Sequence, residues 1–95
     1  MRFRELDPVL HSQVRLAVVS VLMGVDAAEF NFLLECTRTS KGNLSFQLTK
    51  LKEAGYIDIH KSFRGNYPLT TCKITEKGKK AFEEYVDSIS DYLNN

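Results

Sequence analysis

Four side chains in the middle of the chain combine types that could recognise a nucleic acid. They are Asn43, Phe46, Gln47 and Lys50. At about 100° per residue these positions share one stripe of a helix. The stripe holds two amides, an aromatic ring and an ammonium group, and no carboxylate. Because an amide offers the donor and the acceptor that match adenine bidentately, the stripe suits a polyanion that presents base edges.

Neighbouring side chains extend this candidate site. Lys41 and Lys50 would reach guanine acceptors or phosphates, and the ring of Phe46 would touch thymine methyl groups. The alternative for Phe46 is to pack on a neighbouring wing or on a partner subunit, and the alternative for Asn43 and Gln47 is an ordinary solvated helix face. The other candidates for DNA contact in and before this helix are Arg38, Thr39, Ser40 and Ser45.

A helix over residues 40–54 would position these side chains. Thr39 and Ser40 are good N-cap residues, because a short side-chain oxygen accepts hydrogen bonds from the first turn. Gly55 suits the left-handed residue that ends a helix. The face opposite the polar stripe would pack on the core through Leu44, Leu48 and Leu51.

The flanking segments predict the remaining elements. Asp7-Pro8 predicts the start of a first helix that Gly24 ends. Residues 25–29 are a short connection with room for a brief strand, and residues 30–36 form a short second helix. After the 40–54 helix, strands over 56–63 and 69–75 flank a turn over 64–68. Thr75 then caps a last helix.

The order of helix, helix, helix, hairpin and helix predicts an α+β fold that is mainly α with a small β-hairpin wing. We expect a single winged helix-turn-helix domain over residues 1–95. Its helix-turn-helix would span about 30–55, its wing about 56–75 and its C-terminal helix about 76–93.

Composition is that of an ordinary globular protein, with 43% apolar and 26% charged residues. No apolar run approaches the ~20 residues of a membrane span, and the N-terminus has no signal-peptide core, so we expect a cytoplasmic protein. Cys36 and Cys72 are expected to be buried free thiols in a reducing compartment. With only His11 and His60 as further soft ligands, we expect no metal site and no cofactor.

The net charge of +1 is unevenly distributed. Residues 38–64 carry a net charge of +4, whereas residues 1–37 carry −2 and residues 65–95 carry −1. The basic surplus thus coincides with the polar helix and the hairpin, which is the footprint expected for phosphate contact.

In the hairpin, Lys61 and Arg64 would bind backbone phosphate, and Arg64 could enter the minor groove. Asn66 is either a further contact or simply a turn residue. Phosphate contacts fix the register of a protein on DNA but carry no sequence information.

The last helix has a wider apolar stripe than a small three-helix lobe can cover. We expect a dimer interface formed by Phe3, Leu6, Phe82, Tyr85, Val86, Ile89, Tyr92 and Leu93. The alternative is packing of this stripe against the first helix of the same chain. A two-fold dimer would place two 40–54 helices about one DNA turn apart, ~34 Å, on a near-palindromic site.

Five motifs follow one another along the chain. They are Leu-Asp-Pro-Val-Leu-His-Ser at 6–12, Thr-Ser-Lys-Gly-Asn-Leu-Ser at 39–45, Glu-Ala-Gly-Tyr-Ile at 53–57, Lys-Ser-Phe-Arg-Gly at 61–65 and Ile-Thr-Glu-Lys-Gly at 74–78. Together they resemble small stand-alone winged-helix regulators of the MarR/ArsR type. The resemblance implies a homodimer that binds double-stranded DNA and regulates transcription, with room for an unidentified small-molecule effector. The ArsR branch senses metal through a cysteine pair that is missing here, so metal sensing does not carry over.

Other classes of function fit the sequence less well. An enzyme is not expected, because there is no nucleophile elbow, no phosphate-binding glycine loop and no evident His–carboxylate pair. RNA binding has no aromatic strand motif to support it. The main alternative is a winged helix used only for protein–protein contact, which predicts no affinity for duplex DNA.

Overall fold

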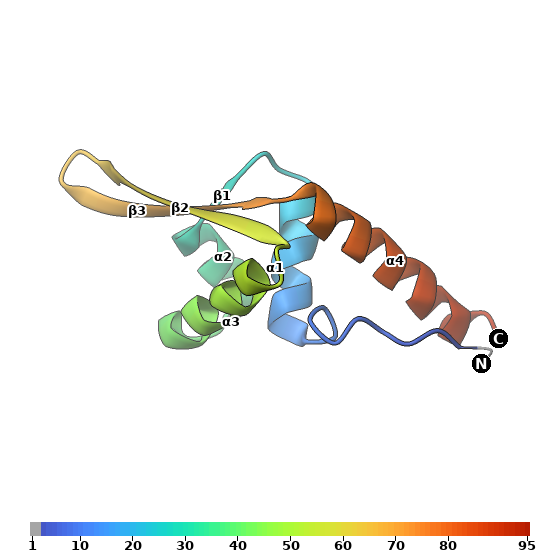
Figure 1. Ribbon diagram of the computed structural model, residues 1–95. Helices are drawn as coiled ribbons and strands as arrows, with labels where there is room; N and C mark the ends of the chain where they lie inside the picture. Colours follow the sequence, from blue (N-terminus) through green and yellow to red (C-terminus); the bar gives the residue numbers. More distant parts are fainter. Residues whose placement is uncertain (1–2) are drawn as a thin grey trace.

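Four helices and three strands make up the part of the chain described by the computed structural model, residues 3–95 (Figure 1). They are α1 (Gln13–Met23), β1 (Ala28–Glu29), α2 (Phe30–Thr37), α3 (Lys41–Glu53), β2 (Ile57–Arg64), β3 (Tyr67–Ile74) and α4 (Glu76–Leu93). The strands form one antiparallel sheet in the order β1-β3-β2. This arrangement confirms the predicted fold class. The first two residues of the predicted domain lie outside the described range.

The first helix begins later than the sequence predicted, after the N-cap Ser12. Asp7 closes a separate turn instead. Its Oδ1 accepts a hydrogen bond from the Val9 amide at 2.8 Å, and its backbone carbonyl accepts from the His11 amide at 2.8 Å. The Asp-Pro signal was therefore wrong as the start of α1, because it caps an isolated turn that brings Leu10 into the core.

The core lies where α1, α2 and α3 meet the base of the sheet. Its fully buried side chains are Leu10, Val18, Val19, Leu22, Leu33, Leu44, Leu51, Ile57 and Cys72. Burial raises the pKa of the Cys72 thiol to about 11, because the thiolate would lose its hydration. Cys36, in the last turn of α2, is exposed. The prediction of two buried thiols was thus wrong for Cys36, because α2 fully buries only its Leu33.

The turn between α2 and α3 is made without glycine. Arg38 ends α2 with a φ of 53°, and its amide donates to the Leu34 carbonyl at 2.9 Å. Residues with a Cβ rarely adopt this left-handed conformation. Arg38 thereby takes the place of the glycine that is common in helix-turn-helix turns.

The wing is the long hairpin of β2 and β3, which projects from the helical lobe (Figure 1). The two strands pair along their whole lengths, and the pairing ends with Arg64 opposite Tyr67. Gly65, with a φ of 62°, and Asn66 make the turn. The turn is shorter than the predicted 64–68, because backbone pairing continues to its two flanking residues.

The start of α4 is fixed against the end of the helix-turn-helix. Thr75 caps the helix, and its Oγ1 accepts from the Gly78 amide at 3.0 Å and donates to the Gly55 carbonyl at 2.7 Å. A Cβ at Gly78 would lie 2.2 Å from the Tyr56 carbonyl oxygen. Close approach of these two backbones therefore requires glycine at this position.

From this point α4 runs away from the lobe, and the N-terminal segment lies near its far end, so that the two ends of the described chain are close together (Figure 1). Arg4 Nε lies 3.0 Å from Asp91 Oδ2, and the Tyr92 hydroxyl donates to the Arg4 carbonyl at 3.1 Å. These contacts hold the first segment against the end of α4. Along residues 3–95, no helix has both the length and the apolar character required to cross a membrane.

Candidate nucleic-acid interface

Helix α3 has the capped start and the two faces that the sequence predicted. Ser40 Oγ accepts from the Asn43 amide at 3.1 Å, and Gly55 follows the helix with a φ of 82°. The buried face consists of Leu44, Leu48 and Leu51. The acidic residue of α3 is Glu53, which lies at its C-terminal end, so the polar stripe is free of carboxylates.

Asn43 and Gln47 are hydrogen-bonded to each other within the stripe. Gln47 Nε2 donates to Asn43 Oδ1 at 3.2 Å, and Asn43 Nδ2 donates to Thr39 Oγ1 at 2.7 Å. At the other end, Arg15 of α1 donates from its guanidinium group to Gln47 Oε1. We call this chain of Arg15, Gln47, Asn43 and Thr39 the amide ladder.

The sequence identified three members of the amide ladder but did not connect them to Arg15. The i, i+4 spacing from Thr39 to Asn43 and Gln47 is visible in the sequence and predicts contact along a helix. The contact with Arg15 depends on how α1 packs on α3, and no local pattern reports that.

Phe46 and Lys50 lie side by side on the outer surface of α3. The Phe46 ring is 57% exposed, and Lys50 Nζ lies 4.9 Å from its centroid, within the range of a cation–π contact. A ring this exposed is not packed on the wing of its own chain. That alternative was wrong, and contact with DNA or with a second copy stays a prediction.

The other predicted contacts around α3 are also at the surface. Arg38, Ser40, Lys41 and Ser45 are exposed, and Thr39 is half-buried. They surround the N-terminal half of α3, which is the part of a recognition helix that faces base edges.

The wing carries its predicted residues on one hairpin. Lys61 and Asn66 are exposed. Arg64, 70% exposed, forms an ion pair with Glu29 of β1, with 2.8 Å between Nη2 and Oε1. The sequence did not predict this pair, because it joins strands on opposite sides of β3.

Two aromatic rings near the tip of the wing were missed as candidate contacts. Phe63 is 73% exposed and Tyr67 is 79% exposed. Their position beside the turn was the available signal, since hairpin tips extend beyond the core. Exposed rings next to Arg64 add apolar contact area to a basic surface.

The predicted dimer residues divide into an inner and an outer group. Tyr85 is buried within its own chain, with its hydroxyl 3.0 Å from His11 Nδ1. The half-buried members of the inner group pack on the core, and they are Leu6, Phe82 and Ile89. The side chains of the inner group therefore pack within their own chain, which is the alternative to a dimer contact.

The outer group leaves apolar surface uncovered near the end of α4. Phe3 stacks on Tyr92 with 4.9 Å between ring centroids. The exposed fractions are 47% for Val86, 42% for Tyr92 and 77% for Leu93. A contact between copies would therefore be centred on these three side chains.

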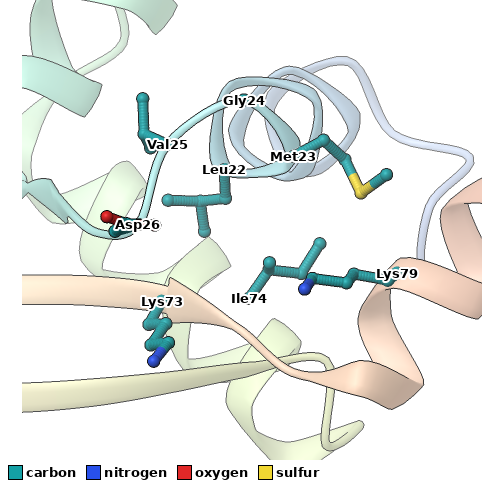
Figure 2. Close-up of a pocket in the computed structure, with 8 residues that line it drawn as sticks. All are labelled: Leu22, Met23, Gly24, Val25, Asp26, Lys73, Ile74 and Lys79. Atoms are coloured by element: carbon teal, nitrogen blue, oxygen red, sulfur yellow. The ribbon is translucent and has the colours of Figure 1, made fainter.

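An open pocket of about 540 Å³ lies where α4 joins the lobe (Figure 2). It is lined by Leu22, Met23, Gly24, Val25, Asp26, Lys73, Ile74 and Lys79. Leu22, Met23 and Ile74 supply apolar walls, and Lys79 extends beside Ile74. Lys79 also pairs with Glu76 at 3.3 Å. Across residues 3–95, no three His, Cys, Asp or Glu side chains are grouped as a metal site.

Comparison with known proteins identifies the family and the fold. Residues 14–93 match the model of a family described as winged helix DNA-binding domain. The uncharacterized protein MJ0432 of Methanocaldococcus jannaschii is 36% identical over 87 residues, which cover 92% of this chain and 95% of that protein.

Two solved structures of regulators share the fold. A transcriptional regulator homologue from Pyrococcus horikoshii OT3 superposes with a TM-score of 0.83 at 22% identity, covering 90% of this chain and 85% of that one. A MarR-family transcriptional regulator from Silicibacter pomeroyi gives a TM-score of 0.68 at 13% identity, covering 88% of this chain and 56% of that one. The fold of this chain is therefore MarR-like. Because residues 14–93 match the family model, this chain belongs to the winged helix DNA-binding domain family.

Proposed function

We propose that the chain is a sequence-specific, duplex-DNA-binding transcriptional regulator that acts as a homodimer in the cytoplasm. In this proposal the recognition helix, residues 40–54, enters the major groove, and the wing, residues 61–68, follows the backbone or the minor groove. The observation that carries it is the outer face of α3, which combines amides, cations and an exposed ring without a carboxylate. A solvated helix face usually mixes charges of both signs.

The roles of individual side chains follow from their chemistry. Asn43 and Gln47 read base edges, and Phe46 contacts thymine methyl groups. Lys41, Lys50 and the polar groups around them bind phosphates or guanine acceptors. On the wing, Lys61 binds phosphate, while Arg64 must exchange Glu29 for a phosphate to do so.

The homodimer in this proposal forms through the outer group on α4. Exposed Val86, Tyr92 and Leu93 support it, because burying large apolar side chains is favourable. We place a small-molecule effector, if the protein has one, in the pocket of Figure 2. A ligand there would contact both the end of α1 and the first turn of α4, and so could change the angle between them.

The first test is selection from a library of duplexes with a random core, performed at two salt concentrations. We expect enrichment of a near-palindromic sequence and an affinity that falls steeply with salt, because each neutralised phosphate releases condensed counterions. Light scattering on the same sample should give twice the mass of one chain. Absence of duplex binding would support the protein-contact alternative instead.

Single substitutions separate reading of bases from attraction to phosphate. With Lys50 on a phosphate, Lys50→Ala should weaken binding to all duplexes alike, whereas with Lys50 on a guanine the loss should be confined to the selected sequence. Gln47→Ala should weaken binding to the selected sequence by about tenfold and leave binding to other duplexes nearly unchanged. Lys80→Ala is the matched control, because Lys80 is exposed on α4 away from the proposed interface. An equal loss in all three variants would contradict the assigned roles.

A further inference from the structure

The amide ladder leads to an inference that rests on the proposed function and names a residue outside the predicted interface. Arg15 lies on α1, and its guanidinium group holds three acceptors. Nε donates to the Val9 carbonyl at 2.6 Å, one terminal nitrogen donates to the Pro8 carbonyl at 3.4 Å, and the other donates to Gln47 Oε1. The group is thus anchored on one side by backbone and presents one N–H to α3.

The chemistry of arginine determines the orientation of the next amide. Guanidinium has donors and no acceptor, so the atom of Gln47 that faces Arg15 must be the oxygen. The Gln47 nitrogen then points along the helix to Asn43, which must offer its own oxygen at 3.2 Å. The Asn43 nitrogen is left facing Thr39 Oγ1, at 2.7 Å.

The donor–acceptor order of both amides therefore follows from a residue on another helix. Within the described chain, each amide uses one N–H and one oxygen lone pair in the ladder and keeps one of each. A base that is read by such an amide meets the donor and the acceptor in one fixed order. A free amide can rotate by about 180° and present the opposite order, at the cost of selectivity between bases.

We propose that Arg15 is a positioning residue for base recognition, and that it sets the order in which Gln47 and Asn43 present their donors and acceptors. Arg15 need not touch DNA for this role. Its effect on Asn43 is transmitted through Gln47, because the side-chain hydrogen bonds of Arg15 among residues 3–95 go to Val9, Pro8 and Gln47.

The first test needs no DNA. The side-chain NH₂ groups of Asn43 and Gln47 are observed by NMR in the wild-type chain and in Arg15→Met, which removes all donors at similar side-chain length. We expect both pairs of resonances to move toward those of free amides and to exchange faster with water. Unchanged Asn43 resonances in this variant would overturn the relay.

A matched variant controls for the lost charge. Lys52→Met removes a cation from the exposed part of α3, and Lys52 is not one of the residues whose hydrogen bonds form the ladder. It should leave both NH₂ groups as they are, and any effect of the lost charge on affinity should be the same for all duplexes. In selection from the random duplex library, Arg15→Met should reduce the preference at the amide-read positions by about tenfold, beyond the loss seen with Lys52→Met.

A second variant keeps the anchor and reverses the order. In Gln47→Glu the carboxylate accepts from Arg15 and also accepts from Asn43, which must turn its nitrogen toward position 47. The base preferred at the position read by Asn43 should then change in identity, whatever the loss in total affinity. This variant keeps a partner for Arg15, so it tests the proposal even if Arg15→Met unfolds.

The outcomes separate the two proposals. If the wild-type chain enriches no duplex, the proposed function fails and the positioning role fails with it. If the wild type enriches a sequence but both Arg15→Met and Gln47→Glu keep the same base preferences, the positioning role alone is overturned.

Discussion

Arg38 combines an unfavourable backbone conformation with a side chain at the predicted DNA surface. Its φ of 53° belongs to the left-handed region, where a Cβ costs roughly 1–2 kcal/mol. Glycine would adopt this conformation without that cost. A contact between the guanidinium group and a DNA phosphate would explain why this position holds arginine and not glycine.

Arg38→Gly should therefore separate stability from binding. We expect the free energy of unfolding to rise by about 0.5–1 kcal/mol, measured by urea titration. The slope of log affinity against log salt should fall by about 0.9, the value for one phosphate contact. Arg38→Lys keeps both the strain and the charge, so it should change neither quantity much. A gain in stability without a change in salt slope would remove Arg38 from the interface.

Tyr56 makes stability depend on alkaline pH. Its hydroxyl donates to Asp7 Oδ2 at 2.5 Å, and desolvation together with this carboxylate raises the pKa of Tyr56 from 10.0 to about 12. The folded state thus favours the neutral phenol. The contribution is complete below pH 10 and is lost as the pH rises from 10 to 12.

Comparison of the wild type with Tyr56→Phe isolates this contribution. The variant should be less stable at neutral pH by about 1 kcal/mol, since it lacks the hydrogen bond to Asp7. The difference between the two proteins should shrink from pH 10 upward. Ionisation of Cys72 also lowers the free energy of unfolding at high pH, but it does so equally in both proteins. Tyrosinate absorbance reports the pKa directly, and a difference independent of pH would contradict the assignment.

At the scale of elements, the sequence predicted best where local chemistry decides the structure. The leucine spacing, the Ser40 cap and Gly55 located α3 closely, and Thr75 located the start of α4. The alternating strands and their Gly-Asn turn located the wing. Each of these signals involves residues that are neighbours in the sequence, so a pattern can report them.

The sequence predicted poorly where distant segments meet. The turn at Asp7 has the local marks of a helix start, but α1 begins only after Ser12. The contact of Arg15 with Gln47, the pair of Glu29 with Arg64 and the inward position of Tyr85 all depend on packing between elements. The contacts that the sequence did not predict therefore affect the candidate site more than the fold.

Two glycines in helices should respond oppositely to alanine. A Cβ at Gly78 would lie 2.2 Å from the Tyr56 carbonyl oxygen, whereas nothing lies within 4 Å of a Cβ at Gly42. Gly78→Ala should destabilise the protein by about 2–3 kcal/mol, because backbone cannot give way as a side-chain end can. Gly42→Ala should stabilise it by about 0.5–1 kcal/mol through helix propensity. Thermal unfolding of both variants checks this, and similar midpoints would refute the close approach.

At the scale of the whole molecule, α4 and the wing extend a small lobe to principal-axis extents of 54 × 25 × 21 Å. The outer group on α4 lies far along this extension, on the helix that leaves the lobe (Figure 1). A contact between copies at that place would keep both copies of α3 and both wings clear of the dimer surface. In the proposed function, this separation would let one chain dimerise and bind DNA at the same time.

Charges in the outer group should convert a dimer into folded monomers. For Val86→Glu with Leu93→Glu, we expect light scattering to give the mass of one chain, because a contact between copies would bury the new carboxylates. Circular dichroism should be unchanged, since both side chains are exposed. Lys80→Glu is the control for charge on α4. A dimeric mass in the double variant would place the contact elsewhere.

The two cysteines give the molecule a built-in attachment point. Cys36 is open to solvent, whereas Cys72 is buried and its raised pKa disfavours the reactive thiolate at neutral pH. A maleimide dye or spin label would therefore attach once per chain without any engineered cysteine. In an assembly of two copies, the distance between the two labels would report the distance between the two helix-turn-helix units. A second label on each chain would, in turn, report that the core has opened.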